Sequence, residues 1–228
     1  PVSEDVAQYL SNLQSEGKVK LVSLEENVGL GRALAAGTEH CSCEWIARMD
    51  SDDICAPDRM EKQAAYLEAH PEVDVLGGNI AEFIDSPDDI VSKRIVPEDH
   101  EKICEYLKKR CPFNHMTVVI RKNALEKAGG YQHWHFNEDS YLWARMYLSG
   151  ARFANLSEIL CYVRVGNEMF RRRGGYSYYK SERDLFKFMY KNKIINWFEY
   201  QQAKFIRFVV QVLMPNSVSC LLYTSDAA

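Results

Sequence analysis

The stretch Glu44-Trp-Ile-Ala-Arg-Met-Asp-Ser-Asp-Asp53 joins a short apolar segment to a cluster of three carboxylates. Residues 44–49 are typical of a strand that enters a core, and Asp50 and Asp52 would face the same side of an extended chain. Like charges at the end of an apolar strand are costly unless a cation or hydrogen-bond donors compensate them. A hard divalent cation that also carries substrate phosphates fits such oxygen ligands. A turn rich in Asp and Ser is the plain structural alternative.

Length and composition describe one ordinary domain, or one domain with an appendage. Of the 228 residues, 46% are hydrophobic and 26% are charged, which is enough apolar material for a core. The net charge of −4 argues against a general nucleic-acid binder. The seven cysteines show no zinc-type spacing, so we expect reduced thiols and a cytoplasmic protein.

Upstream of the carboxylates, the chain alternates between helix and strand patterns. Residues 2–17 have apolar side chains at helical spacing, and residues 19–24 predict a strand. Residues 27–37 begin with a glycine-rich turn and continue as a helix. The N-terminus of such a helix can hold a phosphate, although an ordinary strand-to-helix turn explains the same residues.

Downstream, helix and strand patterns continue with short connections. A helix is expected from about Pro57 to Ala69, and strand material at 73–79 and 81–85 with a bulge at the glycines between them. This alternation predicts an α/β fold with a mostly parallel sheet. Ligands of such sheets bind outside the carboxyl ends of the strands, where Asp50 and Asp52 fall.

The second half of the chain contains a second pair of acidic residues. A helix at about 98–109, a strand at 113–120 and a helix ending at Gly129-Gly130 precede them. Asn137 is a suitable N-cap, and Glu138 and Asp139 suit the positive end of a helix dipole. Ordinary helix capping explains both carboxylates, and the functional alternative is that one of them faces the cleft as a general base.

The C-terminal part leaves two alternatives open. One or two strands are expected at 151–165, followed by a basic loop at 171–175 that is either solvated surface or a diphosphate contact. Residues 176–214 predict helices that mix aromatic residues with lysines. They would pack on the domain or lie on a membrane surface.

Three motifs in order make the chain resemble the family 2 glycosyltransferases, over a span from about Asn27 to Lys180. The motifs are Asn27–Gly37; Ala47–Ile54 followed by Pro57, Arg59 and Gln63; and Gly129–Tyr131 followed by Glu138, Asp139, Leu142, Trp143 and Arg145. The stretch Arg-Arg-Gly-Gly-Tyr at 172–176 is similar to enzymes of bacterial exopolysaccharide assembly, of the amylovoran type.

The resemblance implies the α/β GT-A fold, a Rossmann-like mixed sheet flanked by helices. Family members open with two strands that bind the nucleotide base and ribose, and this chain has neither, so we expect a fragment that lacks its first strands. The expected parts are a partial catalytic domain at 1–170 and a basic loop with a C-terminal helical appendage at 171–214. Residues 220–228 resemble a translated sequencing adapter and are expected to be non-native.

The resemblance also implies a role for each motif residue. Asp50 and Asp52 would hold Mn²⁺ or Mg²⁺ against the diphosphate of a UDP-, GDP- or dTDP-sugar, and Asp139 would be the catalytic base beside Glu138. The expected donor-binding residues are Asn27, Gly29, Arg32, Asp50, Asp53, Arg172 and Arg173, and the expected acceptor-binding residues are His115, Trp143 and Arg145. Many relatives have a histidine ligand where this chain has Gly166, so Arg172 and Arg173 are the expected substitutes.

The expected function is an inverting sugar transfer to a lipid-linked glycan in cell-surface polysaccharide synthesis, at the inner face of the membrane. For His115, a satisfied structural histidine is the alternative to a donor that contacts the acceptor. Two other functions stay open. A nucleotidyltransferase would release pyrophosphate instead of a nucleoside diphosphate, and a non-catalytic carbohydrate-binding domain would bind sugar without turnover.

Overall fold

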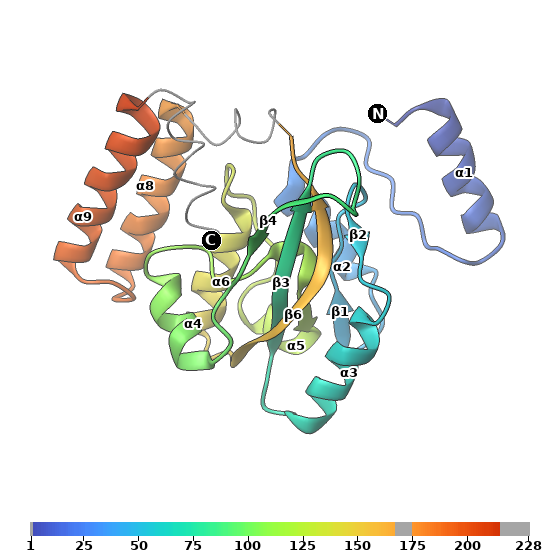
Figure 1. The fold of residues 1–228 in the computed structure, drawn as a ribbon, viewed down its shortest axis with the longest axis horizontal. Helices are drawn as coiled ribbons and strands as arrows, with labels where there is room; N and C mark the ends of the chain where they lie inside the picture. The colour runs from blue at the N-terminus through green and yellow to red at the C-terminus, as the bar shows by residue number, and fades with distance from the viewer. Residues whose placement is uncertain (1, 167–174, 215–228) are drawn as a thin grey trace.

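A curled sheet of six strands forms the centre of the molecule, with helices on its faces (Figure 1). The computed structural model describes residues 2–166 and 175–214, so Arg172, Arg173 and the tail at 220–228 lie outside it. The strands are β1 (Trp45–Ala47), β2 (Ile54–Cys55), β3 (Val75–Phe83), β4 (Ile90–Arg94), β5 (Val119–Arg121) and β6 (Phe153–Arg164). Their order is β1-β5-β3-β6-β2. Strand β4 also pairs with β3, further along β3 than the residues that pair with β5.

The sheet is mixed, as the family resemblance implies, but the expectation of a mostly parallel sheet is wrong. Among the described strands, β3 and β6 form a parallel pair and the four other pairs are antiparallel. Strand β5 runs between β1 and β3 in the opposite direction to both. Strand β4 returns along β3 after a short turn, and a short connection of this kind produces antiparallel pairing.

The long pair β3 and β6 is irregular where the glycines of β3 lie. The register between the two strands shifts next to Asn79, which confirms the bulge expected there. A Cβ atom on Gly77 would lie 2.4 Å from Asn155 Oδ1, and one on Gly78 would lie 2.5 Å from Leu160 Cδ1. Glycine is therefore required because side chains of β6 fill the space that a larger residue would need.

Helices cover the sheet, and the largest core cluster lies beneath α4, α5, α6 and α8. Helix α6 contributes Leu142, Trp143, Ala144 and Met146 to this cluster, all fully buried. The helices are α1 (Glu4–Ser15), α2 (Leu30–Glu39), α3 (Arg59–Ala69), α4 (His100–Leu107), α5 (Lys122–Lys127), α6 (Glu138–Leu148), α8 (Tyr176–Lys191) and α9 (Trp197–Phe208). A 3₁₀ turn η1 (His115–Thr117) and a π-helical turn η2 (Val209–Leu213) complete the described elements.

The predicted strand at 19–24 is wrong, because the described chain has no regular structure there. A strand is stabilised by a neighbour in a hydrogen-bonded ladder, and no described strand runs beside this segment. Val19, Leu21 and Leu24 are exposed, and the backbone N–H of Leu21 donates to the Gln14 side chain instead. The predicted first helix is present as α1, which lies apart from the sheet in Figure 1.

The predicted strand at 113–120 is only partly present. Its first half forms η1, and the ladder covers Val119–Arg121. The Thr117 hydroxyl explains the difference, because it donates to the Asn114 carbonyl at 2.7 Å and closes a local turn. Side chains of this type compete with strand pairing by such local bonds.

The C-terminal helices form an antiparallel pair at one side of the domain (Figure 1). Helix α8 packs on the domain and adds Leu185, Phe186 and Met189 to the main core. Helix α9 packs on α8, and its own side chains all keep some exposure in the described structure. None of the helices in the described residues has the length and apolar character needed to cross a membrane.

Candidate active site

The three carboxylates after β1 lie on a turn that leads into β2, and all three line one cavity of about 560 Å³. The chain is not extended here, since Ser51 and Asp52 form the turn. Strand alternation therefore does not explain how Asp50 and Asp52 come to the same side. The turn brings Asp53 to the cavity as well, which an extended chain would have pointed away.

Asp50 is held by a buried arginine. The two terminal nitrogens of Arg48 each approach one oxygen of the Asp50 carboxylate at 2.5 Å. Arg59 fixes the backbone on which this pair stands, because its Nη2 donates to the Arg48 carbonyl at 2.9 Å and its Nε donates to Gln63 at 2.9 Å. Arg59 and Gln63 are fully buried, so these motif residues support the site from beneath.

Asp52 and Asp53 have different surroundings. Asp52 is exposed and makes no hydrogen bond or ion pair within the described part of the chain. Asp53 accepts a hydrogen bond from the Arg164 backbone N–H at 3.2 Å. Burial, with smaller contributions from Asp50 and Asp52, raises the pKa of Asp53 to about 6. Added positive charge at the turn would favour the ionised form of the Asp53 carboxyl.

Asp139 faces the same cavity from the first turn of α6. Its Oδ1 accepts the Ser140 backbone N–H at 2.6 Å, and its Oδ2 accepts a hydrogen bond from the Cys111 thiol at 3.4 Å. Asn137 occupies the N-cap position but forms no capping bond, since its amide donates to the Ser181 hydroxyl at 3.1 Å. A carboxylate that is held in place and open to a cavity has the geometry of a general base.

Glu138 points elsewhere. It is half-buried, and it does not belong to the described residues that line the cavity. Its Cβ would lie 3.3 Å from a Cβ placed on Gly31 of α2, so it packs between the two helices. Burial and the charge of Asp139 raise the pKa of Glu138 to about 7.

The three residues expected to bind the acceptor all lie in the interior. Trp143 is 0% exposed and packs on Phe113, and Arg145 donates to the Ala128 carbonyl at 2.6 Å. His115 is buried, bonds to the Tyr131 hydroxyl at 2.9 Å, and has its pKa lowered to about 3 by burial and by Arg48. This burial argues for structural roles in place of the expected acceptor contacts, and for His115 it favours the structural alternative.

The glycine-rich turn before α2 is present, although no strand precedes it in the described chain. The Asn27 side chain accepts the Gly29 backbone N–H at 3.0 Å, and Gly29 has a φ of 81°, which favours glycine. Asn27 and Arg32 are exposed, so they are accessible to a ligand. The next residue, Leu30, lines the cavity itself.

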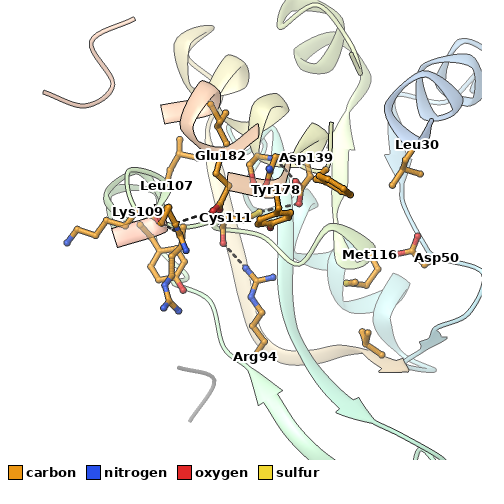
Figure 2. A pocket seen from close by; sticks show the side chains of 18 of the residues that line it. Leu30, Asp50, Arg94, Leu107, Lys109, Cys111, Met116, Asp139, Tyr178 and Glu182 are labelled. Carbon is orange, nitrogen blue, oxygen red and sulfur yellow. Dashed lines mark hydrogen bonds and ion pairs between the residues drawn. The ribbon is translucent and has the colours of Figure 1, made fainter. Parts of the chain in front are cut away.

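The cavity also has lining residues that no sequence motif indicated. They include Glu82, Arg94, Lys109, Arg110, Cys111, Arg164, Glu182 and Arg207. Figure 2 shows Asp50 and Lys109 at opposite ends, with Cys111 and Asp139 between them. Several of these residues come from β4, from the loop that follows α4, from α8 and from α9. Only the folded chain brings them together.

A metal site would have two protein carboxylates at most from the acidic turn. Among the described residues, no group of three His, Cys, Asp or Glu side chains could hold an ion. Mg²⁺ is commonly held by one or two carboxylates together with substrate phosphates. The exposed Asp52 and the neighbouring Asp50 fit that pattern, although Arg48 already engages both oxygens of Asp50.

Comparison with known proteins gives consistent results. The model of glycosyl transferase family 2 matches residues 2–133. An uncharacterized glycosyltransferase of Haemophilus influenzae is 46% identical over 190 residues, which are 83% of this chain and 70% of that protein. The amylovoran biosynthesis glycosyltransferase AmsE of Erwinia amylovora is 38% identical over 226 residues, 99% of this chain and 84% of that one.

The name of one Escherichia coli relative states its substrates. The UDP-Gal:alpha-D-GlcNAc-diphosphoundecaprenol beta-1,3-galactosyltransferase is 31% identical over 222 residues, 97% of this chain and 80% of that protein. Among solved structures, S. aureus TarS aligns with a TM-score of 0.62 at 17% identity, over 92% of this chain and 60% of that one. The Pyrobaculum calidifontis mannosyltransferase PcManGT, in complex with GDP-Man and Mn²⁺, aligns with a TM-score of 0.58 at 16% identity, over 98% of this chain and 62% of that one.

Proposed function

Because the chain belongs to glycosyl transferase family 2, we propose that it transfers a sugar from a nucleotide-sugar to a hydroxyl group of a glycan acceptor, with inversion at the anomeric carbon. Its fold is the GT-A fold. The observation that carries the proposal is that the acidic turn at 50–53 and the Asp139 carboxylate line the same cavity. A donor and an acceptor can therefore meet between them.

Asp139 is the proposed base. As the acceptor oxygen forms its bond to the anomeric carbon, the bond from that carbon to the diphosphate oxygen breaks, and the hydroxyl proton passes to the Asp139 carboxylate. Its hydrogen bonds from Ser140 and Cys111 fix the carboxylate for this step. One displacement of this kind inverts the configuration and passes through a state with positive charge on the sugar ring.

The acidic turn is the proposed site for the donor diphosphate. Asp52, with Asp50, would hold Mn²⁺ or Mg²⁺ there, and the ion would neutralise the charge that builds on the departing nucleoside diphosphate. Arg48 keeps the Asp50 carboxylate in a fixed orientation. Further donor contacts are proposed for Asn27, Gly29, Arg32 and Asp53, and for Arg172 and Arg173 outside the described residues.

The acceptor is proposed to be a lipid-linked glycan, met at the cytoplasmic face of a membrane. Helix α9 turns apolar side chains outward, since Phe198 is 73% and Phe205 is 68% exposed. Its polar Arg207 points inward and lies 3.5 Å from Glu182. Residues 176–214 contain seven Lys and Arg but three Asp and Glu, in a chain of net charge −4. An apolar face among basic residues suits an anionic membrane surface.

Nucleoside diphosphate release from a series of nucleotide-sugars, with Mn²⁺ or Mg²⁺, tests this function. We expect one donor to give release that increases when a glycan acceptor is added. Release of pyrophosphate would instead indicate a nucleotidyltransferase. Sugar binding without any release, in a folded protein, would indicate the non-catalytic alternative.

A further inference from the structure

Two cysteines stand directly opposite each other on neighbouring strands beside the acidic turn. Cys55 of β2 and Cys161 of β6 are partners in the antiparallel register. The backbone N–H of Ala56 donates to the Leu160 carbonyl at 3.0 Å, so the hydrogen-bonded pair is the next one along the ladder. Cys55 and Cys161 therefore form a non-hydrogen-bonded pair, in which the two side chains leave the same face of the sheet and approach each other closely.

The spacing of this pair suits a disulfide bond. Residues opposite each other in a non-hydrogen-bonded pair have Cα atoms about 4.5 Å apart, which is within the range of about 4.4–6.8 Å that disulfides span. Both cysteines are free thiols in the structure. Cys55 Sγ lies 3.5 Å from the Ala56 carbonyl oxygen, at the surface. A change of the Cys55 χ1 rotamer redirects this sulfur toward its partner, without a shift of the backbone.

The two thiols differ in accessibility and in acidity. Cys55 is exposed, whereas Cys161 is buried. Burial raises the pKa of the Cys161 thiol to about 11, although the Arg59 guanidinium opposes this shift, and the charge of Cys55 adds to it. A reagent in solution therefore meets Cys55 first. Cys161 reacts from within the fold, where its fixed position opposite Cys55 compensates for a small fraction of thiolate.

We propose that Cys55 and Cys161 are a redox-sensitive pair that glutathione disulfide converts to a reversible disulfide between β2 and β6. The Cys55 thiolate attacks one sulfur of the reagent, whose S–S bond breaks and releases one glutathione as its thiolate. Cys161 then gives up its proton and attacks Cys55 Sγ in the mixed disulfide, which releases the second glutathione. Two protein thiols are oxidised, and one glutathione disulfide is reduced to two thiols.

The disulfide also acts on the support of the acidic turn. Cys161 Sγ lies 3.5 Å from Arg59 Nη1 and 3.5 Å from Met49 Sδ. Arg59 holds the Arg48 carbonyl, and Met49 directly precedes Asp50. Because the new bond draws the sulfur toward β2, it disturbs both contacts, and oxidation should lower the activity. This consequence rests on the proposed function, whereas formation of the disulfide does not.

Peptide mapping of the full chain after oxidation with glutathione disulfide tests the pair. In wild type, Cys55 should be linked to Cys161, and dithiothreitol should return both thiols. Cys161→Ser should instead carry glutathione on Cys55, because no second thiol displaces it. Cys43→Ser, which removes another exposed cysteine, is the matched control and should form the bond as wild type does. If Cys55 keeps glutathione in wild type, or is linked to a different cysteine, the proposal is overturned.

Nucleoside diphosphate release measures the effect of the bond on activity. Oxidised wild type should release the product several-fold more slowly than reduced wild type, and dithiothreitol should restore the rate. Cys55→Ser should keep its rate after the same oxidation. Equal rates for wild type with and without the disulfide would refute the control of activity. A protein that uses no nucleotide-sugar would refute the proposed function, and peptide mapping would still decide whether the disulfide forms.

Discussion

The Cys111 thiol donates a hydrogen bond to the carboxylate of Asp139, with 3.4 Å between Sγ and Oδ2. Burial and the charge of Asp139 raise the pKa of the Cys111 thiol to about 12. The sulfur therefore stays protonated at neutral pH and acts on the carboxylate as a donor. The proposed base is thus held from two sides, by a backbone N–H of its own helix and by a side chain from the loop after α4.

This contact predicts that Cys111→Ala lowers kcat by about tenfold, because a bond to an ionised group contributes about 1.5–3 kcal/mol and part of that is replaced by water. Cys111→Ser keeps a donor at the same place and should retain most of the activity. Steady-state kinetics of the two variants checks this. Equal activity of Cys111→Ala and wild type would show that the thiol does not position the base.

The packing of α2 on the loop before α6 predicts opposite effects for two glycines of one helix. A Cβ on Gly31 would lie 2.5 Å from the Gln132 carbonyl oxygen, whereas a Cβ on Gly37 meets no atom within 4 Å. Gly31→Ala should therefore destabilise the protein by about 1–3 kcal/mol through overpacking. Gly37→Ala should stabilise it by up to about 1 kcal/mol through helix propensity. Urea unfolding of both variants measures the difference, and a similar free energy of unfolding for the two would contradict the packing described.

The raised pKa of Glu138 predicts a pH-dependent stability. The pKa is raised from 4.5 to about 7, so between these values the folded state binds more protons than the unfolded chain. The free energy of unfolding therefore falls as pH rises from about 4.5 to about 7, and this contribution is constant above that. Glu138→Gln removes the titration. Relative to wild type, the variant should gain stability between pH 5 and pH 8 in urea unfolding, and a difference that is independent of pH would refute the assignment.

The exposed face of α9 predicts binding to anionic vesicles. Phe198 and Phe205 project from the outer face of the helix, so a Phe198→Ser/Phe205→Ser variant should lose most of its binding in vesicle co-sedimentation. Activity on a water-soluble acceptor should be retained. Met60→Ser, which changes a 50% exposed side chain on α3, is the control. Binding that is equally strong for the double variant and for wild type would remove α9 as the membrane contact.

The sequence marked Asp50, Asp52, Asp53 and Asp139 as site candidates because they stand at boundaries between elements that local patterns mark, and their roles stay predictions. Local patterns mark the strand at 45–47 and the helix that begins at Glu138. The positions of the acidic residues next to these elements could therefore be predicted. The family motifs added the pairing of these two ends in one cleft. Arg59 and Gln63 are motif residues whose physical role beneath Arg48 only the structure gives.

The rest depended on partners that no local pattern encodes. Residues 19–24 have strand-like composition, but a strand forms only with a neighbour, and the described chain provides none there. The direction of β5 is set by its tertiary position between β1 and β3. The alternation of elements along the chain therefore could not predict its antiparallel pairing. Arg94 and Arg207 are separated by about half of the chain, and only tertiary packing brings both to the loop at 109–111.

The most direct test of the central claim is nucleoside diphosphate release by Asp139→Asn beside wild type, with the preferred donor and a glycan acceptor. The substitution keeps the size of the side chain and removes its ability to take a proton. We predict a loss of kcat by about 10²–10⁴-fold with donor binding retained. Asp85→Asn, outside the described cavity lining, should release at the wild-type rate. Acceptor-dependent release at the wild-type rate by Asp139→Asn would show that Asp139 is not the base.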